Sequence, residues 1–257
     1  MERLSNVIKL SVVNNIGYVA MEDREYKNTF SMQFVSGLKE TFALIDQNPQ
    51  IKVVIIHGFD NYFSCGGTKE ELIGLYEGIG KTGSEKVQFD DLKFHDLLLN
   101  CEVPVIAAMQ GHAIGGGLAF GSFADIIVLA EEAIYNAIFM KYGFTPGMGA
   151  TYIIPRKFGA LLGNEMLYTA KNYYGKELKE RGAPAKIVSK RDVIPTAVEI
   201  AEELADKPIG SLKLLKEHLT QEMRRELPLY IENELHMHEK SFVQQEVRDR
   251  IESKFGK

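Results

Sequence analysis

The chain of 257 residues is long enough for one large α/β domain or two small ones. Its 30 basic and 35 acidic residues give a net charge of −5, so it lacks the positive field on which nucleic-acid binders depend. Two cysteines, Cys65 and Cys101, favour a reducing cytoplasm over a disulfide-linked secreted scaffold. Residues 1–13 lack an apolar signal-peptide core, and no window reaches about 18 apolar residues, so we expect neither export nor a membrane span.

An antiparallel hairpin opens the chain, because apolar segments at 7–13 and 18–21 flank a turn-rich junction at 14–17. Ser31 stands at the N-cap of a predicted helix of about four turns. This helix ends before Pro49, which cannot continue it.

Three continuous apolar runs follow at 53–56, 104–108 and 126–129, and each is typical of a strand buried on both faces. Helical segments separate these runs, so we predict a parallel sheet. Between the first two runs lies a glycine-rich polar segment, from 66 to about 86, which we interpret as a mobile flap around a short helix at 70–76.

After residue 195 the pattern becomes wholly helical, and we divide the chain into an α/β core at 1–194 and a helical region at 195–257. We expect Pro208 and Pro228 to separate the helices of this region. Its predicted helices are 198–205, 211–219 and 229–255.

Two glycine-rich segments each follow a predicted buried strand: FSCGG at 63–67, and GHAIGGG at 111–117, which opens a helix. Glycine lets a ligand approach peptide N–H groups closely, and a helix amino terminus adds its dipole to those donors. If the sheet places both strand ends side by side, one N–H from each turn can converge on a developing enolate oxygen. That arrangement is an oxyanion hole.

Glycine clusters of this kind have two other interpretations. Glycine clusters after strands also hold nucleotide phosphates, but the first strand-to-helix turn lacks Gly-x-Gly-x-x-Gly with its acidic partner, and no Lys-Ser or Lys-Thr closes a phosphate loop. The glycines could also serve only as tight turns or close helix contacts.

Further motifs follow in order along the chain: Ala124-Asp125, GFTPGMG at 143–149, LKERGAP at 178–184 and LADKP at 204–208. Together with FSCGG and GHAIGGG, they resemble the motifs of the enoyl-CoA hydratase (crotonase) superfamily over nearly the whole chain. The resemblance implies an α/β fold built as a spiral of ββα units, with a helical C-terminal region and a trimer or a dimer of trimers. It also implies an acyl thioester whose carbonyl lies between the N–H groups of Cys65 and Gly116.

Hydratases of this family activate water with two glutamates, and the resemblance places those positions at Ala119 and Phe139. Neither side chain can accept or donate a proton, so the pair that hydration requires is absent. Phe139 makes its wall of the pocket apolar and excludes water from a reactive enolate. We therefore expect a reaction that generates its own carbanion. Loss of CO₂ from a carboxylate vinylogous to a thioester does so without proton abstraction.

The segments 62–68, 140–151 and 237–242 resemble the subgroup that decarboxylates in polyketide β-branching. This resemblance implies that Lys81, in the flap, holds or balances the departing carboxylate. His238 would orient that carboxylate or relay a proton to the γ-carbon. The substrate would be a 3-methylglutaconyl group on the phosphopantetheine of acyl carrier protein, converted to 3-methylcrotonyl with no metal or redox cofactor.

Four other side chains bear on the site. His236 lies two positions from His238, so on a helix the two point to different faces and cannot both line one pocket; we choose His238 on its motif position. Tyr76 could anchor the flap helix or reach the substrate with its hydroxyl. Arg24 and Lys27 follow the second strand, where family members contact the pantetheine phosphate, or they form a solvated charged turn.

Two other functions stay open at this point. An enoyl-thioester isomerase or hydratase with acid and base from elsewhere would turn over a thioester without a free carboxylate. A catalytically inactive crotonase scaffold that binds an acyl carrier or RNA would give no product at all. A nucleophilic thiol at Cys65 is not expected, because no histidine lies near it in the sequence. The carrier could be coenzyme A or acyl carrier protein.

Overall fold

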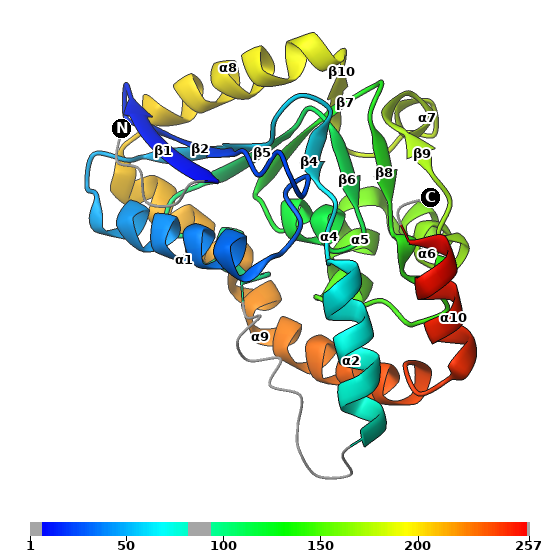
Figure 1. Cartoon of the computed structure of the whole chain (residues 1–257). Coiled ribbons are helices and arrows are strands. Elements are labelled where there is room, and N and C mark those ends of the chain that lie inside the picture. The colour runs from blue at the N-terminus through cyan, green and yellow to red at the C-terminus, as the bar shows by residue number, and fades with distance from the viewer. Residues whose placement is uncertain (1–6, 82–93, 256–257) are drawn as a thin grey trace.

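The computed structural model describes residues 7–81 and 94–255, with the backbone alone at residues 75 and 78–81. Its strands form one sheet of six and one of four (Figure 1). The six-stranded sheet has the order β1-β2-β3-β5-β7-β10, and only its first pair is antiparallel. These strands are β1 (Ile8–Val13), β2 (Ile16–Met21), β3 (Val53–His57), β5 (Val105–Met109), β7 (Ile126–Ala130) and β10 (Lys186–Val188).

The predicted hairpin and the predicted parallel sheet are both confirmed. Asn14 and Asn15 join β1 to β2 with positive φ at both positions, which is the conformation that a two-residue hairpin turn of the favoured hand requires. The three apolar runs form β3, β5 and β7. They are buried on both faces because helices cover the sheet on either side.

The four-stranded sheet has the order β4-β6-β8-β9, with β4, β6 and β8 parallel. Strands β3, β5 and β7 of the main sheet are each followed along the chain by one strand of the second sheet, namely β4, β6 and β8. Each such pair of strands therefore extends both sheets. That repetition produces the predicted spiral and brings the ends of β4 and β6 together. The strands are β4 (Tyr62–Ser64), β6 (His112–Ile114), β8 (Ile134–Asn136) and β9 (Tyr173–Tyr174).

Helices connect and cover the sheets. Ser31 caps the first of them as predicted, with its side chain accepting the N–H of Phe34. The helices before the C-terminal region are α1 (Met32–Gln47), α2 (Lys69–Lys81), α3 (Leu97–Asn100), α4 (Gly116–Ser122), η2 (Ile138–Lys141), α5 (Ala150–Phe158), α6 (Ala160–Thr169), α7 (Gly175–Glu180) and η3 (Lys190–Asp192).

Helix α2 extends further than the short helix predicted at 70–76. Thr68 and Glu71 form a reciprocal capping box: the Thr68 N–H donates to the Glu71 carboxylate over 2.9 Å, and the Glu71 N–H donates to Thr68 Oγ1 over 3.1 Å. This cap starts a helix that continues through the glycines to residue 81. The remainder of the predicted flap, from residue 82 to about 86, lies outside the described residues.

The C-terminal region contains α8 (Val193–Ala205), α9 (Ile209–Ser241) and α10 (Gln245–Lys254). The predicted division at Pro228 is wrong, because α9 runs through this proline without a break. Contacts on both sides explain this continuity: Lys216 binds the carbonyls of Leu98 and Val103, and Glu234 binds the start of α5. The predicted continuous helix at 229–255 is also wrong, because the chain turns at residues 242–244.

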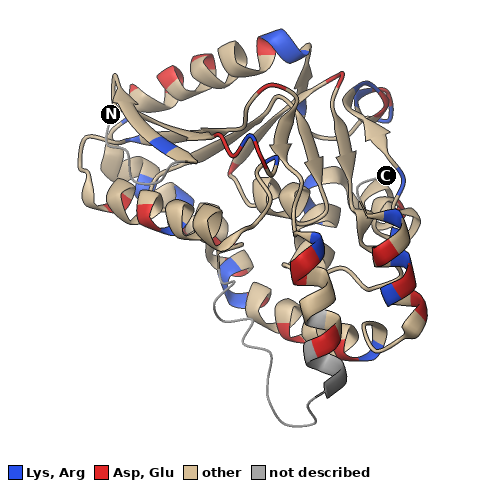
Figure 2. Ribbon diagram, viewed as in Figure 1, with Lys and Arg blue, Asp and Glu red and all other residues tan. Residues whose placement is uncertain are grey.

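Helix α8 lies along the outer face of the six-stranded sheet and packs against β3, β5 and β7 (Figure 1). The proposed boundary at residue 195 therefore falls inside a helix that belongs to the core. Charged residues gather on α2, α8 and α10, whereas the strands are mainly uncharged (Figure 2). In the parts of the chain that the structure describes, no helix has the length and apolarity needed to cross a membrane.

Candidate active site

The two glycine turns meet in the structure as the sequence predicted. Strands β4 and β6 are parallel neighbours, with Tyr62 opposite His112. A Cβ placed on Gly66 would lie 2.7 Å from the carbonyl oxygen of Ile114 and 3.1 Å from the amide nitrogen of Gly116. Only glycine permits so close an approach, and Gly66 also has a positive φ of 75°.

The N–H groups of the first turn are not equivalent. That of Cys65, the predicted oxyanion donor, donates to the carbonyl oxygen of Lys27 over 3.2 Å. That of Gly66 donates to Ser64 Oγ, also over 3.2 Å. Among the residues that the structure describes, the N–H of Gly67 has no acceptor. The structure therefore differs from the sequence prediction here, because it engages the Cys65 N–H internally and leaves that of Gly67 for a ligand.

The second turn presents Gly116 as the first residue of α4. N–H groups in the first turn of a helix have no intrahelical acceptor, and the helix dipole favours an anionic oxygen there. A Cβ on Gly116 would lie 2.6 Å from Met148 Sδ and 2.7 Å from Phe30 Cε2. The backbone of this predicted donor is thus enclosed between two apolar side chains.

The thiol of Cys65 is a poor nucleophile in this setting. Burial raises the pKa of this thiol to about 11, which outweighs the opposing effect of the Lys27 charge. The group is therefore protonated near neutral pH, in agreement with the expectation that it does not attack the substrate.

His238 and His236 have different environments. His236 is exposed, whereas His238 is 8% exposed and its Nε2–H donates to the carbonyl oxygen of Thr145 over 2.8 Å. Burial lowers the pKa of His238, although its backbone hydrogen bonds oppose this effect. The imidazole is therefore neutral at pH 7. Phe144 and Phe242 meet its ring edge to face. Of the two histidines, only His238 faces the motif at 143–149.

Glu234, one helical turn before His238, is a buried residue that the sequence analysis missed. Its carboxylate accepts the N–H of Gly149 over 2.7 Å, the N–H of Thr151 over 2.8 Å and the Thr151 hydroxyl over 2.5 Å. Burial raises the pKa of this carboxyl, and these hydrogen bonds counteract the effect. The i, i+4 spacing from His238 is the sequence signal that could have identified it.

Phe139 and Ala119 occupy the positions of the missing glutamates. Phe139 lies in η2 and its ring centroid is 6.1 Å from that of Phe144, which itself stacks on Phe242. Phe139 and His238 thus lie against the same aromatic ring. Ala119 is fully buried within α4. The surroundings of both positions are apolar.

Tyr76 and Lys81 lie on α2. The hydroxyl of Tyr76 donates to Gln245 of α10 over 3.1 Å, and the guanidinium of Arg248 lies 5.5 Å from its ring centroid. In the structure Tyr76 therefore anchors α2 to α10, which is the first of the two roles that the sequence analysis gave it. Lys81 is the last residue of α2, and its side chain lies outside the described part of the structure.

Arg24 and Lys27 border the loop that leads into β4. Arg24 forms an exposed ion pair with Asp60 at 2.7 Å, and Lys27 Nζ lies 5.2 Å from the ring centroid of Tyr62. Lys190 reaches the same loop from η3 through a hydrogen bond to the Asn61 side chain. These cations therefore stand beside the strand that ends in the first glycine turn.

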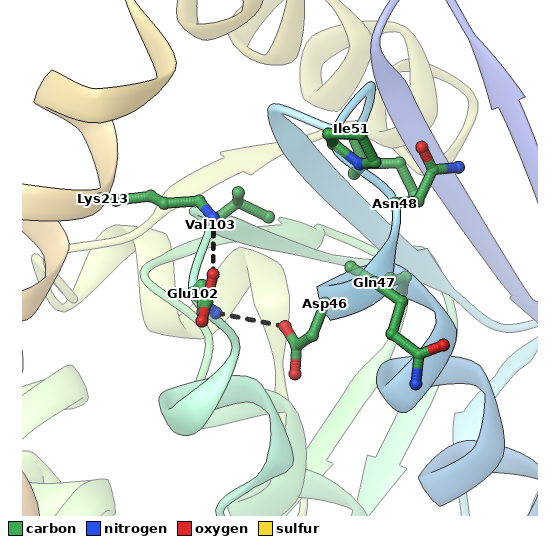
Figure 3. Close-up of a pocket in the computed structure, with 9 residues that line it drawn as sticks. Asp46, Gln47, Asn48, Ile51, Glu102, Val103 and Lys213 are labelled. Atoms are coloured by element: carbon green, nitrogen blue, oxygen red, sulfur yellow. Dashed lines mark hydrogen bonds and ion pairs between the residues drawn. The ribbon is translucent and has the colours of Figure 1, made fainter.

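A pocket in the described surface lies away from these residues, between the end of α1 and α9 (Figure 3). Lys213 pairs there with Glu102 at 2.5 Å, and Asp46 accepts the Glu102 N–H over 3.5 Å. Burial is the largest cause that raises the pKa of Asp46. No residue predicted for the active site lines this pocket, so we assign it no part in the chemistry.

The ββα spiral and its adjoining glycine turns define a crotonase fold. The chain belongs to the enoyl-CoA hydratase/isomerase family, whose model matches residues 11–255. The family inferred from the motifs is thereby confirmed.

Similar proteins include decarboxylases that match nearly the whole chain. The bacillaene synthase decarboxylase PksI of Bacillus subtilis (strain 168) is 48% identical over 247 residues, covering 96% of each chain. A solved chain from a dehydratase/decarboxylase enzyme couple involved in polyketide β-branching has a TM-score of 0.93 and 47% identity, covering 98% of this chain and 100% of the other. The decarboxylase domain of CurF from Lyngbya majuscula has a TM-score of 0.89 and 41% identity, covering 97% and 99%.

Proposed function

We propose that the protein is a crotonase-family lyase that decarboxylates a 3-methylglutaconyl-type thioester to the 3-methylcrotonyl thioester in polyketide β-branching. The observation that carries this proposal is the pair of adjoining glycine turns beside positions 119 and 139, where no side chain can move a proton. The likeness to decarboxylases named for polyketide systems supports it.

The first requirement of this reaction is an oxyanion hole. In the proposal, the thioester oxygen accepts the N–H groups of Gly116 and Gly67, since that of Cys65 already donates to Lys27. The bond between C4 and the C5 carboxylate then breaks and CO₂ leaves. Its electron pair moves through the C2–C3 double bond to the thioester oxygen as a dienolate. Fixed N–H donors stabilise this developing charge more than they stabilise the neutral carbonyl.

The second requirement is to hold the carboxylate and to protonate C4. Lys81, at the end of α2, would balance the departing carboxylate. His238 is neutral and donates its Nε2–H to the Thr145 carbonyl, so in this arrangement it has no N–H for the carboxylate and would orient the substrate through the segment at 145–149 that it holds. The apolar surroundings of Phe139 would keep water from the dienolate until the Lys81 ammonium gives C4 its proton, which Lys81 would regain from solvent after CO₂ has left.

The carrier and the assembly belong to the same proposal. Acyl carrier protein would present its phosphopantetheine thioester past Arg24 and Lys27, whose charges border the loop before β4. A homotrimer or hexamer would cover Leu214, Leu215 and Leu219 of α9, which are 69%, 55% and 70% exposed in the single chain. A cytoplasmic location agrees with the two free thiols.

A mass-spectrometric assay tests the activity. The protein is incubated with 3-methylglutaconyl and crotonyl thioesters, each on acyl carrier protein and on coenzyme A. We expect loss of the mass of CO₂ from the first acyl group and no addition of water to the second. Addition of the mass of water to the crotonyl group, with no loss of CO₂ from the 3-methylglutaconyl group, would contradict the proposal. Comparison of the two carriers identifies the one that the enzyme uses.

A further inference from the structure

Met148 has a backbone conformation that side chains other than those of Asn and Asp rarely adopt. Its φ is 62°, in the left-handed region. Elsewhere in the described chain, the non-glycine residues with positive φ are Asn or Asp, the C-cap Ala170, and Lys27. Gly147 and Gly149 flank Met148. Glycine therefore stands on either side, whereas the left-handed position between them is occupied by a methionine.

Helix α9 explains why the two neighbours are glycines. A Cβ on Gly147 would lie 2.4 Å from His238 Cε1, and one on Gly149 would lie 2.8 Å from Leu227 Cδ1. The N–H of Gly149 is also held by Glu234 at 2.7 Å. These contacts fix the backbone on both sides of Met148 and maintain its unfavourable conformation.

The side chain of Met148 lies against the second glycine turn. Its Sδ and Cε atoms are 2.6 Å and 3.5 Å from the place that a Cβ on Gly116 would occupy. Met148 is partly exposed, whereas Gly116 is buried. An acyl group whose carbonyl oxygen binds the N–H of Gly116 would therefore have this thioether beside it.

We propose that Met148 is a specificity-determining residue that limits the size of the acyl branch accepted next to Gly116. The inference rests on the proposed function in one respect, namely that the Gly116 N–H holds the thioester oxygen. The backbone strain at Met148 is retained because the side chain is needed at that place. An apolar wall of this kind discriminates between ligands that differ by one methylene group.

The test compares Met148→Gly with Met148→Leu, which keeps the volume of the side chain. The kcat/KM is measured for 3-methylglutaconyl and 3-ethylglutaconyl thioesters on one carrier. We expect Met148→Gly to raise the ethyl-to-methyl ratio about tenfold or more, and Met148→Leu to keep that ratio within about threefold of the parent. Met148→Gly should also unfold at the same temperature as the parent or higher, because glycine adopts the left-handed conformation without strain.

An unchanged ratio in a folded Met148→Gly variant would overturn the inference. Loss of the folded state in that variant would overturn it as well, because the side chain would then be required for packing. Binding of the two product thioesters, 3-methylcrotonyl and 3-methylpent-2-enoyl, is measured by calorimetry in parallel. If the parent releases no CO₂, the proposed function fails, and the binding ratio still decides whether Met148 limits the branch.

Discussion

Glu234 and His238 lie one turn apart on α9 and bind the same segment at two points. Glu234 accepts the N–H groups of Gly149 and Thr151, and His238 donates to the carbonyl oxygen of Thr145. The motif at 143–149 therefore takes its shape from a helix about ninety residues further along the chain, as the sequence separations of these contacts show.

Glu234→Gln replaces one carboxylate oxygen with an amide that cannot accept a hydrogen bond. At least one of the three donors loses its acceptor, and an unsatisfied buried donor costs about 1–3 kcal/mol. We expect the free energy of unfolding, measured by urea denaturation, to fall by that amount. Glu232→Gln, at an exposed position of the same helix, is the control and should change little. Equal stability of the two variants would contradict the attachment.

His238 makes stability depend on pH. Burial lowers the pKa of the folded imidazole below its ordinary value of 6.5, so the unfolded chain takes up the proton first as the pH falls. The stability that the neutral imidazole contributes is complete above pH 6.5 and is lost as the pH falls through the lowered pKa. Urea denaturation at pH 7.5 and at about pH 5 should show a larger decrease for the parent than for His238→Gln. The exposed His236→Gln variant should keep the decrease of the parent.

Lys81→Ala removes the cation proposed to balance the carboxylate. If this charge acts in the transition state, kcat for decarboxylation should fall about 100-fold or more while the fold is preserved. Lys171→Ala, which removes a lysine from the exposed surface, serves as the charge-matched control. A Lys81→Ala variant with near-parent kcat would remove this residue from the mechanism.

Gly116→Ala introduces a Cβ that would lie 2.6 Å from Met148 Sδ and 2.7 Å from Phe30 Cε2. The backbone or these side chains must shift, and the N–H moves away from the thioester oxygen. Loss of one oxyanion donor reduces kcat about 10²–10³-fold, and we expect a decrease approaching that range. Gly210→Ala is the control, because a Cβ at this position would have no atom within 4 Å, and it should retain the parent rate. Activity of Gly116→Ala within a few-fold of the parent would place the oxyanion hole elsewhere.

Tyr76→Phe removes the hydroxyl that donates to Gln245 and leaves the ring beside Arg248. Because this hydrogen bond is exposed, we expect a stability loss of at most about 1 kcal/mol. Gln245→Ala should have the same effect, and the double variant should be no worse than either single variant. A large decrease in kcat for Tyr76→Phe, absent from Gln245→Ala, would instead show that the hydroxyl acts on the substrate.

Much of the fold could be predicted because its signals are local. The hairpin at Asn14 and Asn15, the cap at Ser31 and the three apolar runs each specify an element within a few residues. The motif order was enough to identify the family. The prediction failed at Pro228, where local helix chemistry indicates an end but long-range contacts of Lys216 and Glu234 hold the helix continuous.

The site was harder to predict because its contacts join distant residues. The Cys65 N–H donates to the carbonyl of Lys27. That carbonyl lies beside it because two separate segments of the chain come together in the fold. Neither the partner of Tyr76 on α10 nor the attachment of Glu234 to α5 leaves a pattern within a short window of sequence.

The sequence by itself determined the family and the absence of the glutamate pair that hydration uses, because glycine turns and missing carboxylates are properties of single positions. Ala119 and Phe139 cannot move a proton in any conformation. Only the tertiary structure decided which N–H groups are available, which histidine is buried, and that Met148 lies against Gly116. Those outcomes depend on where the ends of β4 and β6 and the second half of α9 meet in space.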